Sequence, residues 1–385
     1  MNNQCEATFR ITTPMFIGGG DKKASEVRPS SVKGALRFWW RALNWAQHAK
    51  AHSGDEAAAL RALHAEEARL FGLAAGAERG GQGVFLLSVL QHKVERAEQP
   101  FTDMSQAQLY LLGMGLGGNH ALRNALSGGE FSVRLLFRPR CDAADKQSVL
   151  DALYLFGLLG SLGSRARHGM GSVSLSKWQA DARGAPANRT DYLAALRSLL
   201  SQTAPQAGAA LPPFTAFSPL ARIDLSAHGK DPLALLTLVG SEQQFYRSFG
   251  QNGKVQGKSA ERNFTADHDL IYDATLGKPV SQAPARAVFG LPHNYFFSSS
   301  KAKADVNYAP NRADARRASP LLLHIHALGD TDYLAVHALL PARFLPDGEQ
   351  IRIKAQRTYM VDAKVDWKVL TTYLDRFKER ETAHG

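Results

Sequence analysis

Cysteine is scarce in this sequence: only Cys5 and Cys141 occur, and no CxxC pair is present. A disulfide framework needs several paired cysteines, and a cysteine-ligated zinc site needs closely spaced ones, so the sequence argues against both. Long hydrophobic runs are also missing, because no apolar stretch approaches the roughly 18 residues of a membrane span. No basic segment leads into an apolar core with a cleavage site, so we expect no secretory signal and a cytoplasmic protein.

Acidic residues are in the minority. Asp and Glu total 35 against 46 Lys and Arg, which leaves a net charge of +11 over 385 residues. With 44% hydrophobic residues the composition is that of a folded chain and not a disordered one. The charge is also uneven, since residues 10–50 hold eight basic and two acidic side chains. Clustered positive charge favours nucleic acid as the partner, with an acidic protein as the alternative; we expect no membrane partner.

The predicted elements of the first half follow the order strand, helix, strands, helix, strand. Loose alternation, helical periodicity and turn residues predict strands over 6–17, 84–94, 130–139 and 173–178, and helices over 29–48, 55–72 and 145–159. This order suits a ferredoxin-like βαββαβ unit with extra pieces inserted. The chain exceeds the roughly 250–300 residues at which single cores stop growing, so we expect two domains.

The composition shifts between the two halves. We expect a first domain over residues 1–180, a short helix and linker over 181–213, and a second domain over 214–385. In the second domain, a hairpin is predicted around Gly329-Asp330 and a helix at the end of the chain. The small, polar and basic segment 298–319 predicts a mobile loop. The fold class expected is α+β, with two ferredoxin-like domains in tandem.

Residues 26–46, EVRPSSVKGALRFWWRALNWA, combine tryptophans with a row of cations. Lys33, Arg37 and Arg41 are spaced by four, so they form one stripe along a helix, while Trp39 and Trp40 are expected in the core. Like charges at this spacing repel by a few tenths of a kcal/mol per pair, and a row of phosphates would offset the repulsion. The alternative is a core helix whose long basic side chains reach water.

The start of this helix is a candidate phosphate site. Free amides and the positive end of the helix dipole lie beside Arg28, Ser30 and Ser31.

A second candidate site is the glycine-rich segment 160–171, GSLGSRARHGMG, which holds Arg165, Arg167 and His168. Glycines such as Gly163 and Gly169 let a backbone approach an anion closely, and arginines supply forked donors to phosphate oxygens. The segment is not a nucleotide-binding fingerprint, because it follows a helix and opens a strand. A helix C-cap with a tight turn is the alternative, and we prefer contact with an RNA backbone.

VRPSSVKGALRFWWRAL (27–43) and GSLGSRARHGMGS (160–172) together resemble the RAMP superfamily of CRISPR RNA-binding proteins. FWWRA, FGLPHNYFF (289–297) and RRASPLLLHI (316–325) are similar to the first-numbered RAMP subunit of the type III-B effector complex. The resemblance spans about residues 11–340. It implies two RRM-like domains, binding near the 3′ end of the guide RNA, a role in engaging target RNA, and contacts with other RAMP subunits.

The residues expected to bind RNA come from these two segments. The resemblance implies Lys33, Arg37, Arg165, Arg167 and His168. Helical spacing adds Arg41, and the helix start and the loop backbone add Arg28, Ser31, Gly163 and Gly169.

We expect no catalytic residue, no cofactor and no metal. Cleavage in RAMP relatives uses a histidine site or an aspartate before the SSxKG helix, and here that loop offers only Asp21 and Glu26. His168 is the best general-base candidate, but it lacks an acid partner, so an endoribonuclease that processes repeat RNA is the alternative function.

A metal site is a further alternative. His324 and His326 lie two apart on a predicted strand, with His337 across the hairpin. We expect exposed strand histidines there instead.

Overall fold

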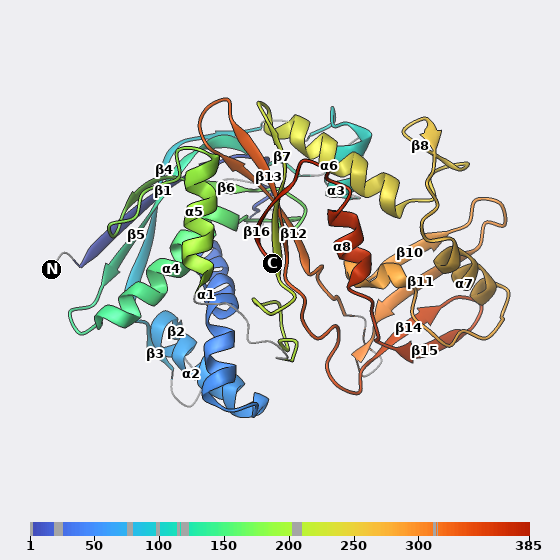
Figure 1. The fold of residues 1–385 in the computed structure, drawn as a ribbon, viewed down its shortest axis with the longest axis horizontal. Coiled ribbons are helices and arrows are strands. Elements are labelled where there is room, and N and C mark those ends of the chain that lie inside the picture. Colours follow the sequence, from blue (N-terminus) through green and yellow to red (C-terminus); the bar gives the residue numbers. More distant parts are fainter. Residues whose placement is uncertain are drawn as a thin grey trace.

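The computed structural model describes residues 3–18, 26–74, 80–97, 101–113, 116, 123–201, 210–310, 313 and 315–385. It is a mixed fold of helices and antiparallel sheets (Figure 1). Asp21 and residues 202–209 of the expected linker lie outside the described residues. Among the described helices, none has both the length and the apolar character that a membrane crossing requires.

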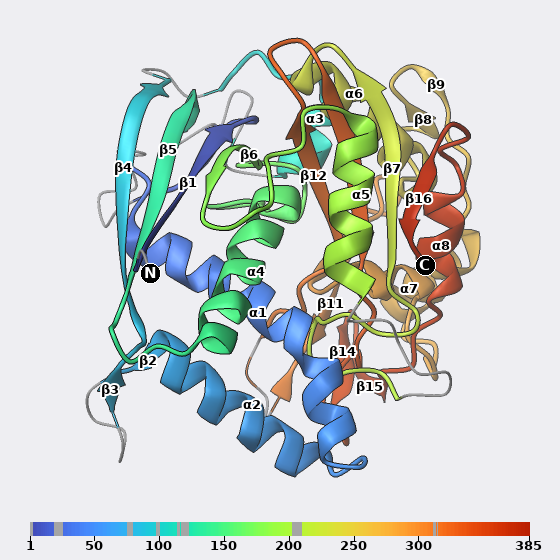
Figure 2. The same ribbon diagram turned by 60° about the vertical axis from the view of Figure 1, so that its left-hand side comes forward.

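The first sheet contains β1 (Gln4–Ile11), β4 (Phe85–Arg96), β5 (Leu126–Phe137) and β6 (Val173–Gln179) in the order β4-β5-β1-β6. All its pairs are antiparallel. Helices α1 (Pro29–Ala51) and α4 (Ala143–Leu159) lie on one face of this sheet (Figure 2). Phe9 of β1 stacks on Phe131 of β5 and meets Phe156 of α4 edge-on at 5.3 Å. Because successive side chains of a strand point to opposite faces, every second side chain of this sheet lies in a core beneath the helices.

The second sheet repeats this arrangement. It contains β7 (Arg222–Gly229), β12 (Leu321–Ala327), β13 (Tyr333–Leu339) and β16 (Glu381–His384) in the order β12-β13-β7-β16. In both sheets the four strands, counted along the chain, lie in the order second, third, first, fourth. Helices α6 (Pro232–Arg247) and α8 (Lys368–Leu374) share a core with one face, through Leu236, Tyr373 and Ile325.

The other face of the second sheet packs on the first half. Leu322, Leu334 and Val336 belong to the same buried cluster as α1 and α4. Tyr192 of α5 (Arg189–Leu200) places its ring 4.4 Å from that of His326. The two halves therefore share one continuous core.

The two sheets also meet edge to edge. Three amides of β12 point at the first half: Leu323 N donates to Arg167 O at 3.0 Å, and Ile325 N and Ala327 N donate to the hydroxyls of Ser172 and Ser174 at 3.1 and 2.7 Å. Two serine hydroxyls and one carbonyl oxygen thus accept hydrogen bonds from those amides of β12 that would otherwise pair with a neighbouring strand.

A third sheet is inserted into the second half, with β10 (His293–Phe296), β11 (Lys303–Tyr308), β14 (Gln350–Lys354) and β15 (Thr358–Asp362) in that order. Helix α7 (Thr265–Thr275) and the 3₁₀ helix η3 (Ala285–Phe289) cover its inner face. Two further helices pack on those already described: α2 (Glu56–Phe71) on α1, and α3 (Gln106–Leu112) on α6. Two short hairpins complete the described elements: β2 (Gly72–Leu73) with β3 (Gly81–Gln82), and β8 (Lys254–Val255) with β9 (Lys258–Ser259).

Two predictions about the second half are wrong in part. Segment 298–319 is not a loop throughout, because residues 303–308 form β11, whose Ala304 and Val306 are buried. The chain does not end in a helix: α8 is followed by β16, which pairs with β7. Both strands carry mostly polar residues, so their pairing partners decide their structure. The hairpin around residues 329–330 is confirmed by the antiparallel pairing of β12 and β13.

Candidate nucleic-acid interface

The basic stripe of α1 lies against α2. Arg37 Nε is 3.1 Å and Arg41 Nη1 2.8 Å from Oε1 of Glu67, a buried residue of α2. Arg37 also donates to the carbonyl oxygen of Gly72 at 2.5 Å. A carboxylate of the chain itself, and not a row of phosphates, therefore offsets the repulsion expected between these arginines.

The other residues of α1 divide between core and surface. Trp39 and Trp40 are buried as predicted, and Trp40 Nε1 donates to Ser148 Oγ at 2.8 Å. Lys33 Nζ lies 6.0 Å from the ring centre of Phe85, and burial, with a smaller effect of Arg37, lowers its pKa. Lys33 thus lies over the edge of the first sheet and not on the open side of α1.

The first turn of α1 is more open. No described side chain caps this end, and Arg28, at the cap position, donates through Nη2 to Gly18 O at 2.8 Å. Ser31 is half-buried, Ser30 is exposed, and a Cβ at Gly34 would have no atom within 4 Å. Pro29 has no N–H, and the amides of Ser31 and Val32 donate to Arg28 O at 3.0 and 3.2 Å, so the amide of Ser30 and the side chains of Arg28 and the serines are what this end offers to an anion.

The glycine-rich loop is held firmly by its backbone. Gly169 has φ +81°, and its carbonyl oxygen accepts from Thr13 Oγ1 at 2.7 Å. Gly163 is exposed with φ +89°, and a Cβ there would lie 2.7 Å from Phe16 O. A Cβ on Gly171, at φ +65°, would lie 2.0 Å from Leu162 O. These glycines fix a rigid path between α4 and β6, at the junction of the two halves.

The loop and α1 lie next to each other. Arg167 places its guanidinium carbon 5.4 Å from the ring centre of Phe38 on α1 and donates to the carbonyl oxygen of Ser319. Burial, with a smaller effect of Arg317, lowers the pKa of Arg167 to about 10. Arg165 is exposed at φ +63°. The two predicted segments thus come together through Arg167 and Phe38.

His168 is unsuited to acid catalysis as it stands. Burial, and then the positive charges of Arg165, Arg247 and Arg167, lower its pKa to about 3. The imidazole is therefore neutral at pH 7 and a weak base.

Arginines from the second half join the loop. Besides burial, the positive charge of Arg316 lowers the pKa of Arg165, that of Arg317 lowers the pKa of Arg167, and that of Arg247 lowers the pKa of His168. Burial, and then the positive charges of Arg247 at the end of α6 and Arg286 of η3, also lower the pKa of His293 on β10. We call six of these residues the junction arginines: Arg165, Arg167, Arg247, Arg286, Arg316 and Arg317.

The junction arginines are poorly neutralised. Asp267 lies 3.5 Å from Arg286 Nε, and in the described parts of the chain no carboxylate forms an ion pair with the other five. The buried Nε atoms of Arg247, Arg286 and Arg317 find no hydrogen-bond partner among the residues that the structure describes. Arg247 Nη2 lies 3.3 Å from His293 Nε2, whose pKa is lowered by burial and by both neighbouring arginines. Guanidinium groups gathered in this way attract an anion.

Sequence reasoning assigned no role to Arg247, Arg286, His293, Arg316 or Arg317. His293 lies in FGLPHNYFF and two of the arginines open RRASPLLLHI, so the motifs that carry the resemblance contain them. Their approach to the glycine-rich loop depends on tertiary structure, which local spacing does not reveal.

The histidines of the second sheet do not form a metal site. His324 and His326 face the first half, with Nε2 and Nδ1 3.3 Å apart, and both are buried, not exposed as expected. His337 pairs with Leu323 in the ladder, so it faces the opposite side and contacts Ser226 and Tyr373. No group of three potential metal ligands is found in the described segments.

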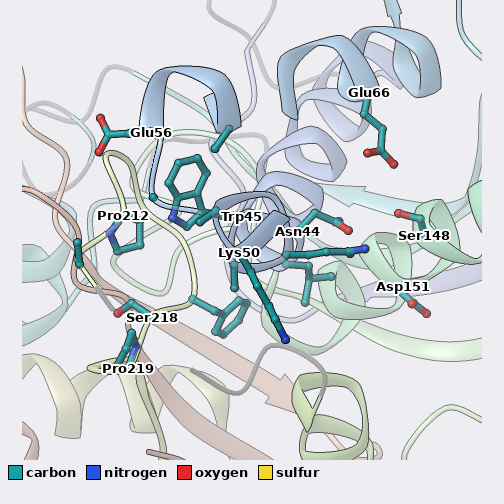
Figure 3. A pocket seen from close by; sticks show the side chains of 18 of the residues that line it. Asn44, Trp45, Lys50, Glu56, Glu66, Ser148, Asp151, Pro212, Ser218 and Pro219 are labelled. Atoms are coloured by element: carbon teal, nitrogen blue, oxygen red, sulfur yellow. The ribbon is translucent and has the colours of Figure 1, made fainter. Parts of the chain in front are cut away.

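A cavity of about 940 Å³ lies elsewhere, between the last turns of α1, the start of α2, α4 and residues 210–219 (Figure 3). Trp45 and Lys50 line it together with several carboxylates. These carboxylates already have partners within the chain: Asp145 with Arg69, Asp151 with Arg183, Glu56 with Arg343, and Glu66 with His48. None of the residues predicted to bind RNA lines this cavity.

Comparisons with known proteins support the resemblance. The family model of the RAMP superfamily matches residues 8–174, a segment that contains both α1 and the glycine-rich loop. No match is found among the curated proteins.

Solved structures extend the similarity to the whole chain. The apo crystal structure of Cmr1 from Pyrococcus furiosus is similar with a TM-score of 0.55 and 16% identity, over 99% of both chains. A chain of the type III-B Cmr-beta complex bound to cognate target RNA is similar with a TM-score of 0.52 and 11% identity, over 97% of this chain and 98% of that one. At these identities the likeness concerns the fold. The model of the RAMP superfamily thus matches residues 8–174, and the fold of the chain is similar to that of Cmr1 over nearly its whole length.

Proposed function

We propose that this chain is a non-catalytic, RNA-binding RAMP subunit of a type III-B CRISPR effector complex in the cytoplasm. It contacts guide RNA near its 3′ end, helps to engage single-stranded target RNA in antiviral defence, and packs against other RAMP subunits, which supply the cleavage. The RAMP match and the likeness to chains of type III-B structures support this assignment.

The architecture is consistent with this role. Each half has the strand order of a ferredoxin-like unit, with α1 and α4 on the first sheet and α6 and α8 on the second. We infer two RRM-like domains in tandem, over residues 1–180 and 214–385, with the third sheet as an insertion in the second.

The junction arginines carry the proposal. Concentrating six guanidinium groups near one carboxylate is costly, and a sugar–phosphate chain would neutralise them with forked hydrogen bonds. We place RNA contacts at Arg165, Arg167 and Arg316, with Gly163, His168 and Gly169 shaping the loop. Arg28 and Ser31 offer a further phosphate site at the start of α1. Lys33, Arg37 and Arg41 contribute charge nearby, while the two arginines also hold α2.

Charge reversal at the junction tests the proposal. In the full chain, Arg165→Glu combined with Arg316→Glu should weaken binding to every single-stranded RNA sequence, because phosphates and not bases are contacted. The dependence of log K on log salt should also become shallower by roughly 0.7 per lost phosphate contact. Fluorescence anisotropy at several salt concentrations measures both, with exposed Arg61→Glu on α2 as the matched control.

Two outcomes would contradict this assignment of contacts. One is a loss of affinity that is confined to particular RNA sequences. The other is an equal loss in the Arg61 control, which would show that net charge alone matters.

An endoribonuclease that processes CRISPR repeat RNA is the second candidate. His293 favours this function. The charge of Arg247 acts on both His168 and His293, so two imidazoles, a candidate acid and base pair, lie near one arginine. Acid–base cleavage needs one imidazole protonated, and the lowered pKa values of both oppose this at neutral pH. Site-specific cuts in repeat RNA that vanish in His168→Ala would establish this function and exclude the first.

A further inference from the structure

The hairpin formed by β10 and β11 exposes a large aromatic side chain. Phe296 is 60% exposed, whereas its neighbours Tyr295 and Phe297 are buried in the core of the third sheet. Alternation along β10 therefore directs Phe296 away from that core. The ring of Phe296 therefore stays in contact with water, and its flat apolar face is available to a ligand.

The surroundings of Phe296 are basic and polar. Lys303 lies directly across the ladder from it, and the turn between the strands consists of three serines and Lys301, all exposed. Asp305, which pairs with Asn294 and lies on the same exposed face as Lys303, is the one carboxylate between residues 294 and 308. In the described parts of the chain neither lysine forms an ion pair.

We propose that Phe296 is a stacking platform for an unpaired RNA base, with Lys301 and Lys303 holding the adjacent phosphates. The inference rests on the proposed function and adds a contact from the inserted sheet. A lone ring surrounded by cations and hydroxyls suits a nucleotide, which presents a flat apolar face next to a negative charge. A protein-docking surface would instead present a contiguous apolar patch.

The same strand connects this platform to the junction arginines. His293, three residues before Phe296, pairs with buried Val306 and so faces the inner side, where Arg247 donates to it. Phe296 and His293 therefore lie on opposite faces of β10, which is the edge strand of its sheet. An RNA strand that leaves the junction arginines over this edge would reach Phe296.

Three substitutions at one position separate stacking from apolar packing. Base–aromatic stacking contributes about 1–3 kcal/mol, so Phe296→Ala should weaken binding of labelled oligouridine by about 5- to 150-fold. Phe296→Leu should lose as much because it has no π face, and Phe296→Trp should retain affinity. Anisotropy titrations of the full chain measure all three, and Leu86→Ala, which removes a side chain of 59% exposure from another sheet, is the matched control.

Salt dependence distinguishes the roles of the ring and the lysines. Phe296→Ala should leave the salt slope unchanged, whereas Lys301→Ala with Lys303→Ala should make it shallower by about 0.7 per contact.

Unchanged affinity in Phe296→Ala, full affinity in Phe296→Leu, or an equal loss in Leu86→Ala would overturn the platform. If charge reversal at Arg165 and Arg316 still weakens binding in that case, the proposed function stands without it. If the wild-type chain binds no RNA, both fail.

Discussion

Glu67 of α2 pairs with two arginines of the basic stripe on α1, so the stripe holds the two helices together. Its Oε1 accepts from Arg41 Nη1 and forms an ion pair with Arg37 Nε at 3.1 Å, while the residue is almost wholly buried, so it joins α1 to α2. In the sequence Glu67 lies 26 residues beyond Arg41, in an alanine-rich segment that is typical of a solvated helix face. The stripe itself was therefore predictable from spacing, but its partner was not.

Removing this carboxylate should destabilise the protein. Glu67→Gln leaves two like charges facing each other, and because both arginines are about one-third exposed we expect a loss of roughly 1–3 kcal/mol. Urea unfolding monitored by circular dichroism measures it. Glu66→Gln, which removes a more exposed carboxylate from the same helix, should cost less than about 1 kcal/mol. Equal losses in the two variants would show that the pairing with the arginines contributes nothing special.

The same contact affects the choice of RNA-binding variants. Arg37→Glu would place a second carboxylate beside buried Glu67, so a loss of RNA binding in that variant would report misfolding as well as lost charge. Arg165 and Arg316 are exposed and have no such partner among the described residues.

At the scale of elements, hydrophobic patterning predicted the main helices and strands of the first half. The predicted helices over 29–48 and 145–159 correspond to α1 and α4, and the predicted strands of the first half to β1, β4, β5 and β6. The strand β11 escaped detection because its two buried residues, Ala304 and Val306, alternate with charged and polar ones in a basic segment. The four-residue β16 carries a single buried alanine, so nothing local marks it.

The glycine-rich loop offers a test at this scale. Gly171→Ala should destabilise the protein by roughly 1–3 kcal/mol, because the residue has a positive φ and its Cβ would meet Leu162 O. Gly34→Ala, in the second turn of α1 with open space around it, should stabilise by about 0.5–1 kcal/mol. Thermal unfolding of the two variants side by side checks both signs. A neutral Gly171→Ala would show that the loop is not held rigid.

At the scale of the whole molecule, the second sheet, which packs on the first half, buries neutral histidines on both of its faces. Burial lowers the pKa of His324 and of His337 to about 3, and that of His326 well below its usual value. Between pH 3 and 6.5 the unfolded chain therefore binds more protons than the native one. Stability should be fully present above pH 6.5 and fall as the pH decreases, by up to about 1.4 kcal/mol per pH unit for each histidine.

Urea midpoints at pH 7.5, 6.5 and 5.5 measure this dependence. His324→Gln should reduce the slope below pH 6.5, whereas His64→Gln, at an exposed position of α2, should leave it unchanged. A stability that does not vary over this range would show that the imidazoles are not kept neutral.

The sharing of one core between the halves was not predictable from the sequence. Two domains were expected from length and from the shift in composition, and the repeated strand order agrees with two units. However, Leu322 and Val336 read as ordinary strand residues, and nothing local indicates that their face packs on the first half. For the same reason the junction arginines could be found only in three dimensions.

The serine contacts between β6 and β12 have one more consequence. Unpaired strand edges recruit other chains, and each four-stranded sheet has two of them. Because Ser172 and Ser174 occupy the amides of β12, the inner edges of the first and second sheets are closed against each other. A neighbouring protein that lengthens either sheet by adding a strand must therefore dock on β4 or β16, the strands at the outer edges of these two sheets.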